Sequence, residues 1–216
     1  MSAMERVEFE AAFLLHARPY RESSQIIEIL GQNHGRIGLV ARGSRRPRSR
    51  WKQTLRSFQP MRMSWAGRGS LQTLGAAEAT AHPLELTGMR LMSGWYMNEL
   101  LINLLHRGDP HPDLFAHYGA ALAALSGQEA LEPVLRRSEL GLLAEIGYGL
   151  VTDRDAAEAR PLQPDRMYAY VADRGPVPAA IGAGEGGDDG LVLSGEDLQA
   201  IGRGVFDRPE RLQVLT

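Results

Sequence analysis

The chain has 216 residues, 44% of them hydrophobic, and a formal net charge of -2 at pH 7, which is enough apolar material for one large domain or two small ones. It contains no cysteine, which excludes disulfides, zinc sites ligated by cysteine and thiol nucleophiles. It has neither an apolar run of about 18 residues nor an apolar leader, so the sequence predicts a cytoplasmic protein that does not enter a membrane.

The charges are divided unevenly along the chain. Residues 1–80 hold 13 Lys and Arg against 6 Asp and Glu, whereas residues 81–216 hold 11 against 20. These opposite charges predict a polyanion-binding domain over residues 1–80, joined to a domain with a different task over residues 81–216. The alternative is that the two parts attract each other electrostatically inside one fold.

Short segments rich in apolar and β-branched residues, separated by turn residues, predict five strands in the first domain. The expected strands cover residues 9–17, 24–30, 36–43, 58–67 and 70–79. Their number and spacing, with a longer insertion between the third and the fourth, are typical of an OB-fold, a small barrel that binds oligonucleotides. An SH3-like barrel is the nearest alternative.

The insertion between the third and fourth strands carries the densest charge in the chain. The stretch RGSRRPRSRWK, residues 42–52, contains six Lys and Arg and no carboxylate. Pro47 disfavours a continuous helix and the cations repel each other, so we expect a mobile loop that contacts nucleic-acid phosphates. A solubilising loop, or a contact with an acidic protein surface, is the alternative. Trp51 is expected either to stack on a base or to anchor the loop on the barrel.

Further arginines are expected to surround the same groove as this insertion. They lie in the first loop, where Arg21 also lies, on the third strand and at the tip of the last hairpin. The predicted nucleic-acid-binding residues are Arg18, Arg36, Arg42, Arg45, Arg46, Arg48, Arg50, Trp51, Lys52 and Arg68.

The second domain is predicted to be mainly helical. Apolar residues at helical spacing predict helices over residues 82–110, 113–126 and 129–149, and their short connections imply a bundle. An irregular segment rich in Gly, Pro and Asp follows. Within and after it we expect a strand at 167–173, a surface loop at 182–190, and short helices that begin at Ser194 and near Arg208. The predicted class is therefore α+β, with an N-terminal OB-fold barrel before a mainly α-helical domain.

The sequence offers no arrangement of catalytic or metal-binding residues. His106, His111 and His117 form the nearest cluster, and their spacing matches no usual zinc pattern. No H-E-x-x-H motif, Walker motif or nucleophile elbow occurs in the sequence. We therefore expect a protein that is not an enzyme and that holds no metal and no cofactor.

Five segments resemble the RecO family of bacterial recombination mediators. They are HARPYRESSQIIEIL, GRIGLVARGSRRPRS, FQPMRMSWAGRGSLQTL, SGWYMNELLINLL and LRRSELGLLAEIGYGL. The resemblance runs in order from about residue 10 to residue 203.

The resemblance implies a protein that binds single- and double-stranded DNA and anneals complementary strands. It also implies work with RecR, which together with this protein helps RecA replace single-strand-binding protein, without nucleotide hydrolysis. Many members carry a four-cysteine zinc motif after the GYG segment. This chain has no cysteine, so a metal-free loop is expected to take over that structural task.

The family's helical domain also docks the acidic C-terminal tail of single-strand-binding protein, which ends in phenylalanine. The resemblance places this partner site at Arg136, Leu140 and Leu143. Their spacing puts a cation beside apolar side chains on one helix face, as such a peptide requires. The alternative is that Leu140 belongs to the core and the stem of Arg136 lies over it.

Two other functions stay open at this point. A structural RNA-binding module, such as a ribosome-associated OB protein, would carry the same basic loop, because phosphates alone do not distinguish DNA from RNA. An enzyme with an unrecognised site would keep its activity after the loop charges are removed.

Overall fold

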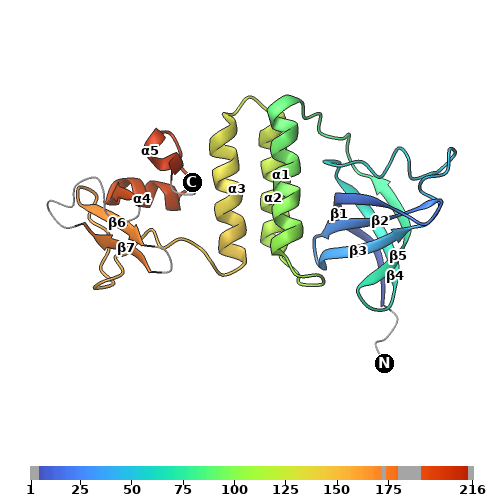
Figure 1. Ribbon diagram of the computed structural model, residues 1–216, viewed down its shortest axis with the longest axis horizontal. Helices are drawn as coiled ribbons and strands as arrows, with labels where there is room; N and C mark the ends of the chain where they lie inside the picture. Colours follow the sequence, from blue (N-terminus) through green and yellow to red (C-terminus); the bar gives the residue numbers. More distant parts are fainter. Residues whose placement is uncertain (1–4, 172–173, 180–190, 214–216) are drawn as a thin grey trace. The chain divides into compact units, whose positions relative to one another are not determined.

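The computed structural model describes residues 5–171, 174–179 and 191–213 (Figure 1). The chain divides into two compact units, Met1–Glu129 and Ala130–Thr216. The first holds a barrel and two helices, and the second holds a helix, a small sheet and two short helices, so the predicted α+β class is confirmed. The predicted domain division at residue 80 marks the end of the barrel and stays a prediction. No helix among the described residues combines the length and apolarity needed to cross a bilayer.

Five strands form a closed barrel in the first unit, as predicted. They are β1 Glu5–Tyr20, β2 Ser24–Gly31, β3 Gly35–Ala41, β4 Met61–Gly67 and β5 Leu71–Ala79. The strand order around the barrel is β1-β2-β3-β5-β4, and all neighbours are antiparallel except β3 and β5. This one parallel pairing closes the barrel in an OB-like topology.

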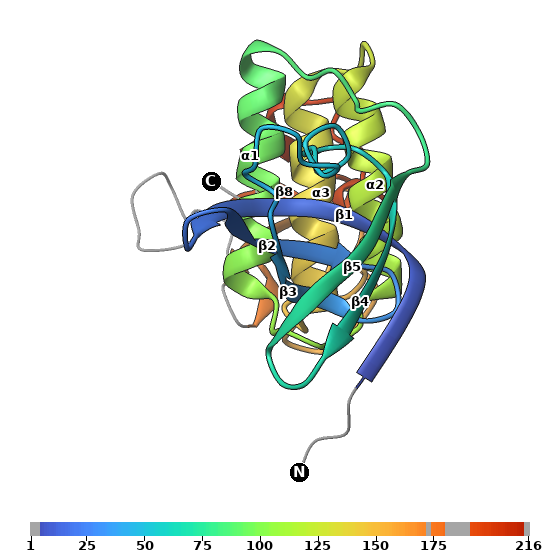
Figure 2. The same cartoon turned by 90° about the vertical axis from the view of Figure 1, so that its right-hand side faces the viewer.

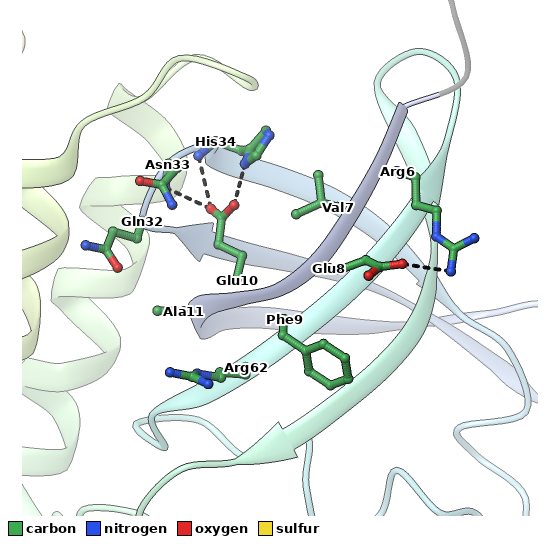
Figure 3. Close-up of a pocket in the computed structure, with 10 residues that line it drawn as sticks. All are labelled: Arg6, Val7, Glu8, Phe9, Glu10, Ala11, Gln32, Asn33, His34 and Arg62. Carbon is green, nitrogen blue, oxygen red and sulfur yellow. Dashed lines mark hydrogen bonds and ion pairs between the residues drawn. The ribbon is translucent and has the colours of Figure 1, made fainter.

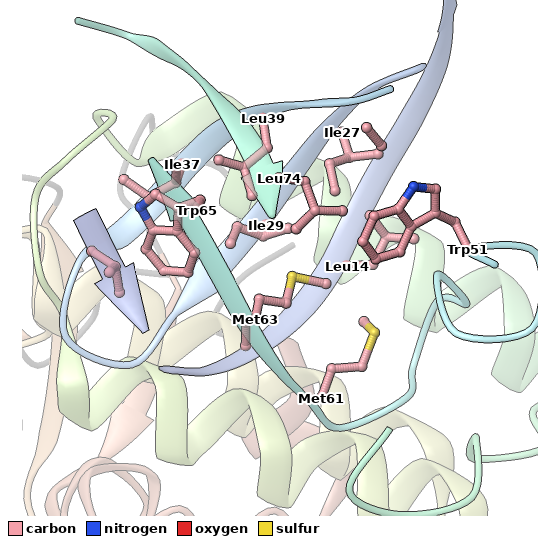
Figure 4. Packing of buried hydrophobic residues seen from close by; sticks show 13 residues of the cluster. Leu14, Ile27, Ile29, Ile37, Leu39, Trp51, Met61, Met63, Trp65 and Leu74 are labelled. Atoms are coloured by element: carbon pink, nitrogen blue, oxygen red, sulfur yellow. The ribbon is translucent and has the colours of Figure 1, made fainter. Parts of the chain in front are cut away.

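Alternation along the strands fills the barrel with large apolar side chains (Figure 4). In β4, Met61, Met63 and Trp65 point inward and are at most 1% exposed, whereas Arg62 between them is exposed. Successive side chains of a strand point to opposite faces, so the apolar residues at alternate positions line one interior. The expected strand boundaries are correct to within a few residues because this pattern is local.

Two helices of the first unit, α1 Gly88–Leu104 and α2 Pro112–Ser126, cover the outside of the barrel along β1. The ring of Phe13 packs against Phe115 and Tyr118, with ring centroids 5.3 and 5.1 Å away. The Asn98 amide nitrogen donates to the Leu15 carbonyl at 2.8 Å, and the Tyr118 hydroxyl donates to the Asn98 side-chain oxygen at 2.6 Å. Burial raises the pKa of Tyr118, which keeps this donor protonated.

The helix predicted over residues 82–110 is shorter than expected. Residues 82–87 belong to no helix or strand, and the Leu84 backbone N–H donates to the Phe58 carbonyl at 3.1 Å. Pro83 disfavours helical geometry in the residue before it, and α1 begins at Gly88, whose φ of 54° suits glycine.

The second unit combines one long helix with a three-stranded sheet. Its elements are α3 Leu131–Glu145, β6 Met167–Val171, β7 Gly175–Pro178, β8 Val192–Ser194, α4 Gly195–Gly202 and α5 Pro209–Leu212. The sheet order is β7-β6-β8, and Tyr168, Leu193 and Leu198 share a buried cluster beneath it. The expected helix beginning at Ser194 is confirmed, and the Ser194 hydroxyl accepts the Asp197 backbone N–H at 3.1 Å.

Three expectations for this half of the chain need qualification. α3 ends at Glu145 rather than at residue 149, because Gly147 has a φ of 86°, outside helical geometry. The predicted three-helix bundle stays a prediction, since α1 and α2 belong to the first unit and α3 to the second. The surface loop expected at 182–190 lies outside the described residues.

A buried carboxylate organises the loop that follows the GYG segment. Asp155 is 7% exposed, and its Oδ1 accepts the backbone N–H groups of Ala157 at 3.0 Å and Glu158 at 2.6 Å. Its own N–H donates to the Arg160 carbonyl at 2.8 Å. Hydrogen bonds to one side chain thus close this turn. Within the described residues, no group of three or more His, Asp or Glu is placed to hold a metal ion.

The Asn98 bridge between barrel and helices gives a prediction for stability. Asn98→Leu leaves the Leu15 carbonyl without its buried donor, so we expect the free energy of unfolding to fall by about 1–3 kcal/mol. Urea denaturation followed by circular dichroism measures the change. Asn103→Leu is the matched control, because Asn103 is exposed on the same helix. Equal stability of the two variants would contradict the structural role of the bridge.

Candidate nucleic-acid interface

The basic loop, residues 42–52, leaves the barrel at the end of β3 and runs through a series of turns. Backbone hydrogen bonds join Arg46 N to the Gly43 carbonyl at 3.2 Å and Ser49 N to the Arg46 carbonyl at 3.0 Å. Arg45 N donates to the Ser23 carbonyl at 2.9 Å, which ties the loop to the turn between β1 and β2. The loop therefore has a defined path in this structure, and its expected mobility stays a prediction.

Trp51 holds the basic loop on the barrel. Its side chain is only 6% exposed and belongs to the barrel core cluster (Figure 4). The indole Nε1 donates to the Arg42 carbonyl at 3.2 Å, and the Arg50 guanidinium lies 4.1 Å from the ring centroid. With its faces covered, Trp51 cannot stack on a base, so that prediction is wrong and the anchoring alternative describes the structure. The reason is the large apolar area that the indole removes from water.

Four cations of the basic loop remain free to meet an anion. Each is exposed and forms no side-chain hydrogen bond or ion pair within the described part of the chain. They are Arg42, Arg46, Arg48 and Lys52. Arg45 donates to the carbonyls of Arg21 at 3.3 Å and Glu22 at 3.4 Å, and Arg50 donates to the Gly75 carbonyl at 2.9 Å. Carbonyl partners leave the charge of Arg45 and Arg50 uncompensated, so all six charges of the loop contribute to its field.

Strand register brings two more predicted cations to the same end of the barrel. Arg18 pairs with Ile26 of β2, and Ile26 pairs with Val40 of β3, immediately before the loop begins. Arg21 lies in the adjacent turn, with its guanidinium 5.2 Å from the Tyr20 ring centroid. The exposed side chains of Arg18 and Arg21 therefore extend the cationic surface of the loop.

Arg36 has a structural role, so its predicted contact with nucleic acid is wrong. Its side chain is 17% exposed and donates from Nε to the Glu28 carboxylate at 3.1 Å. Its other nitrogen donates to the carbonyls of Ile102 and Leu105, the latter at 3.0 Å, which satisfies the C-terminal end of α1. Arg107 pairs with the same carboxylate. The sequence pattern put Arg36 on an outer strand face but could not show that a helix covers that face.

Arg68 is exposed but stands apart from the other predicted residues. The segment between β3 and β4, which contains the basic loop, enters β4 at Met61, and Arg68 follows the opposite end of that strand, after Gly67. Figure 2 shows the loop between β3 and β4 and the turn between β4 and β5 at opposite ends of the barrel. At about 3.3 Å per residue, the length of β4 separates them by roughly 20 Å.

The helices also close the barrel face that other OB-folds use. Oligonucleotides commonly lie across strands 2 and 3 of an OB-fold. Here Glu28 and Leu30 alternate with the core residue Ile29 and so point outward from β2, yet they are 7% and 0% exposed. The barrel surfaces that the helices leave open are the loop end and the outer face of β1, β4 and β5. Arg62, which the sequence analysis missed, lies on this face, and its alternation with Met61 and Met63 was the available signal.

The predicted partner site divides between a groove and the core of the second unit. An open groove is lined mainly by apolar residues of α3, α5 and the segment before α5. The apolar residues are Leu131, Pro133, Leu135, Phe206, Pro209 and Leu212, and the charged residues of the lining are Glu132, Arg136, Asp207 and Arg208. Leu140 packs against the core cluster instead, as its alternative predicted, and neither Leu140 nor Leu143 lines the groove.

Arg136 is held in place at this groove. Its Nε donates to the Leu212 carbonyl at 3.0 Å, and one terminal nitrogen donates to Glu139 at 2.6 Å. α5 is fixed from its other side by Arg211, which is 4% exposed and donates to Asp197 at 2.8 Å. Burial opposes ionisation of Asp197, but hydrogen bonds from Ser194 and Arg211 prevail and lower its pKa.

Comparison with known proteins agrees with both halves of the fold. The family model described as "Recombination protein O N terminal" matches residues 4–82, and "Recombination protein O C terminal" matches residues 86–201. The DNA repair protein RecO of Nitrosospira multiformis is 45% identical over 210 residues, which cover 97% of this chain and 86% of the relative. That of Aromatoleum aromaticum is 43% identical over 213 residues, covering 98% and 87%. That of Coxiella burnetii is 43% identical over 196 residues, covering 91% and 82%. The chain therefore belongs to the RecO family of DNA repair proteins.

Proposed function

We propose that this protein is a recombination mediator that binds single- and double-stranded DNA in the cytoplasm, at the nucleoid. It anneals complementary strands and, with RecR, helps RecA load onto DNA coated by single-strand-binding protein. The observation that carries the DNA contact is the group of four free cations on a loop anchored by Trp51. Arg18 and Arg21 at the same end of the barrel add to it.

The physical basis of binding is the neutralisation of phosphates. Each Lys or Arg contact releases condensed counterions, which provides affinity without reading the base sequence. Because Trp51 and backbone hydrogen bonds tether the loop to the barrel, less conformational entropy is lost on binding than an untethered segment would lose. Charge neutralisation also lets two DNA strands approach each other, so annealing requires no catalytic residue. The protein accordingly acts by binding rather than as an enzyme.

The groove of the second unit is the proposed docking site for the acidic tail of single-strand-binding protein. Its apolar lining suits an aromatic side chain, and Arg136 and Arg208 provide cations for carboxylates, while Glu132 and Asp207 of the same lining limit how many acidic groups it can take. Arg136 is the member of the sequence-predicted trio that lines the groove. RecR, and through it RecA, are the other proposed partners.

Removal of the four free cations tests the DNA contact. The variant Arg42→Ala, Arg46→Ala, Arg48→Ala, Lys52→Ala should bind single-stranded DNA on the order of a hundredfold more weakly near 0.1 M salt. Its slope of log affinity against log salt should be shallower by about 3, since each phosphate contact on a single strand contributes about 0.7. Fluorescence anisotropy with a labelled oligonucleotide measures both quantities.

A matched variant separates this local contact from the effect of net charge. Arg154, Arg160, Arg166 and Arg203 are exposed in the second unit, and their replacement by alanine removes the same number of charges. This control should keep the affinity and the salt slope of the wild type. A loop variant whose salt slope equals that of the wild type would refute the DNA-binding role of the loop.

A comparison of nucleic acids tests the RNA-binding alternative. The family places this chain among DNA repair proteins, so we expect matched DNA oligonucleotides to bind at least as well as RNA and complementary DNA strands to anneal faster with the protein. Strong preference for RNA together with an unchanged rate of DNA annealing would favour a structural RNA-binding module instead.

The partner groove is tested by Arg136→Met, which removes the charge but keeps an unbranched apolar stem. We expect at least a tenfold loss of affinity for an acidic peptide ending in phenylalanine, with DNA affinity unchanged, because a charged hydrogen bond contributes about 1.5–3 kcal/mol. Isothermal titration calorimetry measures the peptide. Arg137→Met is the matched control, since Arg137 is the neighbouring cation on α3 and does not line the groove. Equal losses in the two variants would exclude a specific role for Arg136.

A further inference from the structure

Phe9 has a conformation and an exposure that the packing of the barrel does not explain. It lies in β1, where the register with β4 shifts between Val7 and Glu10, and its φ of 51° is in the left-handed region. Non-glycine residues rarely adopt this conformation, and an aromatic residue there is strained. The side chain is nevertheless 49% exposed and outside the core clusters. The strain therefore presents a large aromatic ring to solvent.

The bulge that turns Phe9 outward is held by specific contacts. The Phe9 backbone N–H donates to the Ser64 hydroxyl at 2.9 Å. On the other side of the strand, the Glu10 carboxylate accepts the backbone N–H groups of Asn33 at 2.8 Å and His34 at 3.1 Å. Figure 3 shows Phe9 and Arg62 on the side of β1 away from Glu10 and His34. Contacts with β4 on one side and with the turn between β2 and β3 on the other therefore hold the backbone at Phe9 in place.

Arg62 lines the same pocket as Phe9, and small side chains follow on the outer sheet face. Arg62 and Ser64 point outward from β4, and Ala76 of β5 lies opposite Ser64 in the strand register. Gly75 is exposed, and its carbonyl accepts the Arg50 guanidinium of the basic loop at 2.9 Å. Within the described residues Arg62 forms no ion pair or hydrogen bond, which leaves its charge free. The outer sheet face between Phe9 and the basic loop therefore carries small side chains beside Arg62. It continues into the loop through the contact of Arg50 with Gly75.

We infer that this surface, made by Phe9, Arg62, Ser64, Gly75 and Arg50, holds single-stranded DNA and selects it over duplex. Phe9 stacks on an unpaired base while Arg62 and Arg50 meet the neighbouring phosphates. In a duplex the bases are already stacked on one another, so the ring has no free base face to bind. The basic loop contacts both forms of DNA, and this surface adds affinity for the single strand alone. The inference rests on the proposed DNA binding.

The composition of the surface favours a nucleic acid over a protein partner. One exposed aromatic ring on a surface that also carries Arg62 and Arg50 matches the base-stacking sites of single-strand binders. A protein partner would instead require a wider apolar patch, and the neighbours of Phe9 are charged or small. Two carboxylates lie near this surface. Glu8 forms an ion pair with Arg6 at 2.8 Å, and Glu78 stands opposite Arg62 in the strand register.

Phe9→Gly tests the stacking role and separates it from a structural one. Glycine adopts a φ of 51° without strain, so the variant should unfold at the wild-type temperature or above it. Its affinity for an oligothymidine should fall roughly five- to hundredfold, while its affinity for duplex of the same length stays at the wild-type value. Leu71→Ala is the matched control, because Leu71 is 38% exposed on the same barrel but follows the distant turn that carries Arg68. It should change neither affinity.

Two further measurements test the stacking contact between the side chain at position 9 and a base. Wild-type protein should bind an oligonucleotide with abasic sites more weakly than the normal strand, whereas Phe9→Gly should bind the two alike. Phe9→Trp should retain single-strand affinity, and its added fluorescence, relative to wild type, should be quenched by oligothymidine and not by the abasic strand.

The outcomes distinguish this inference from the proposed function. Unchanged single-strand affinity in Phe9→Gly, or an equal loss for duplex, overturns the inference. Equal wild-type affinity for normal and abasic strands overturns it as well. If the loop variant loses DNA while Phe9→Gly does not, DNA binding stands and the inference alone fails. If wild-type protein binds neither form of DNA, the proposed function itself fails.

Discussion

The packing of α1 and α2 on the barrel decides which surfaces of this protein can meet another molecule. Outward residues of β1 and β2, such as Phe13 and Leu30, are buried although they point away from the barrel interior. A buried polar bridge through Asn98 and the ion pairs of Glu28 fix the helices against the strands. Polar groups in such a contact must be satisfied, which makes its geometry specific. The usual OB-fold binding face is therefore part of the core of the first unit.

The position of the cations follows from that constraint. Arginines on the covered side serve the fold, as Arg36 does for the end of α1, and those at the opposite end of the sheet remain free. In the proposed mechanism the basic loop binds phosphates of any DNA and Phe9 adds contacts that only an unpaired strand can make. The two surfaces are neighbours because Arg50 reaches from the loop to β5. An annealing protein benefits from this division, since a newly formed duplex would lose the contact with Phe9 and be released more easily.

The second unit is organised by side-chain hydrogen bonds as much as by apolar burial. Asp155 closes the loop after the GYG segment, and the Asp197–Arg211 pair fixes α5 beside α4. These contacts shape the groove that Arg136 lines, because α5 and the residues before it form one of its walls. A chain without cysteine thus builds a compact unit from carboxylate and guanidinium groups.

The sequence by itself determined the five strands, the basic loop and the approximate positions of the three main helices, because strand alternation, helical spacing, turn residues and charge runs are local patterns. It also indicated the family from the order of five segments. Only the tertiary structure decided what individual residues do. Whether Arg36 meets a phosphate or a helix end, whether Trp51 stacks or anchors, and whether Arg68 joins the loop depend on strand register and helix packing between residues far apart in the chain. Phe9 looks like any apolar strand residue until the bulge in β1 turns it outward, since a register shift is set by both strands of a pair.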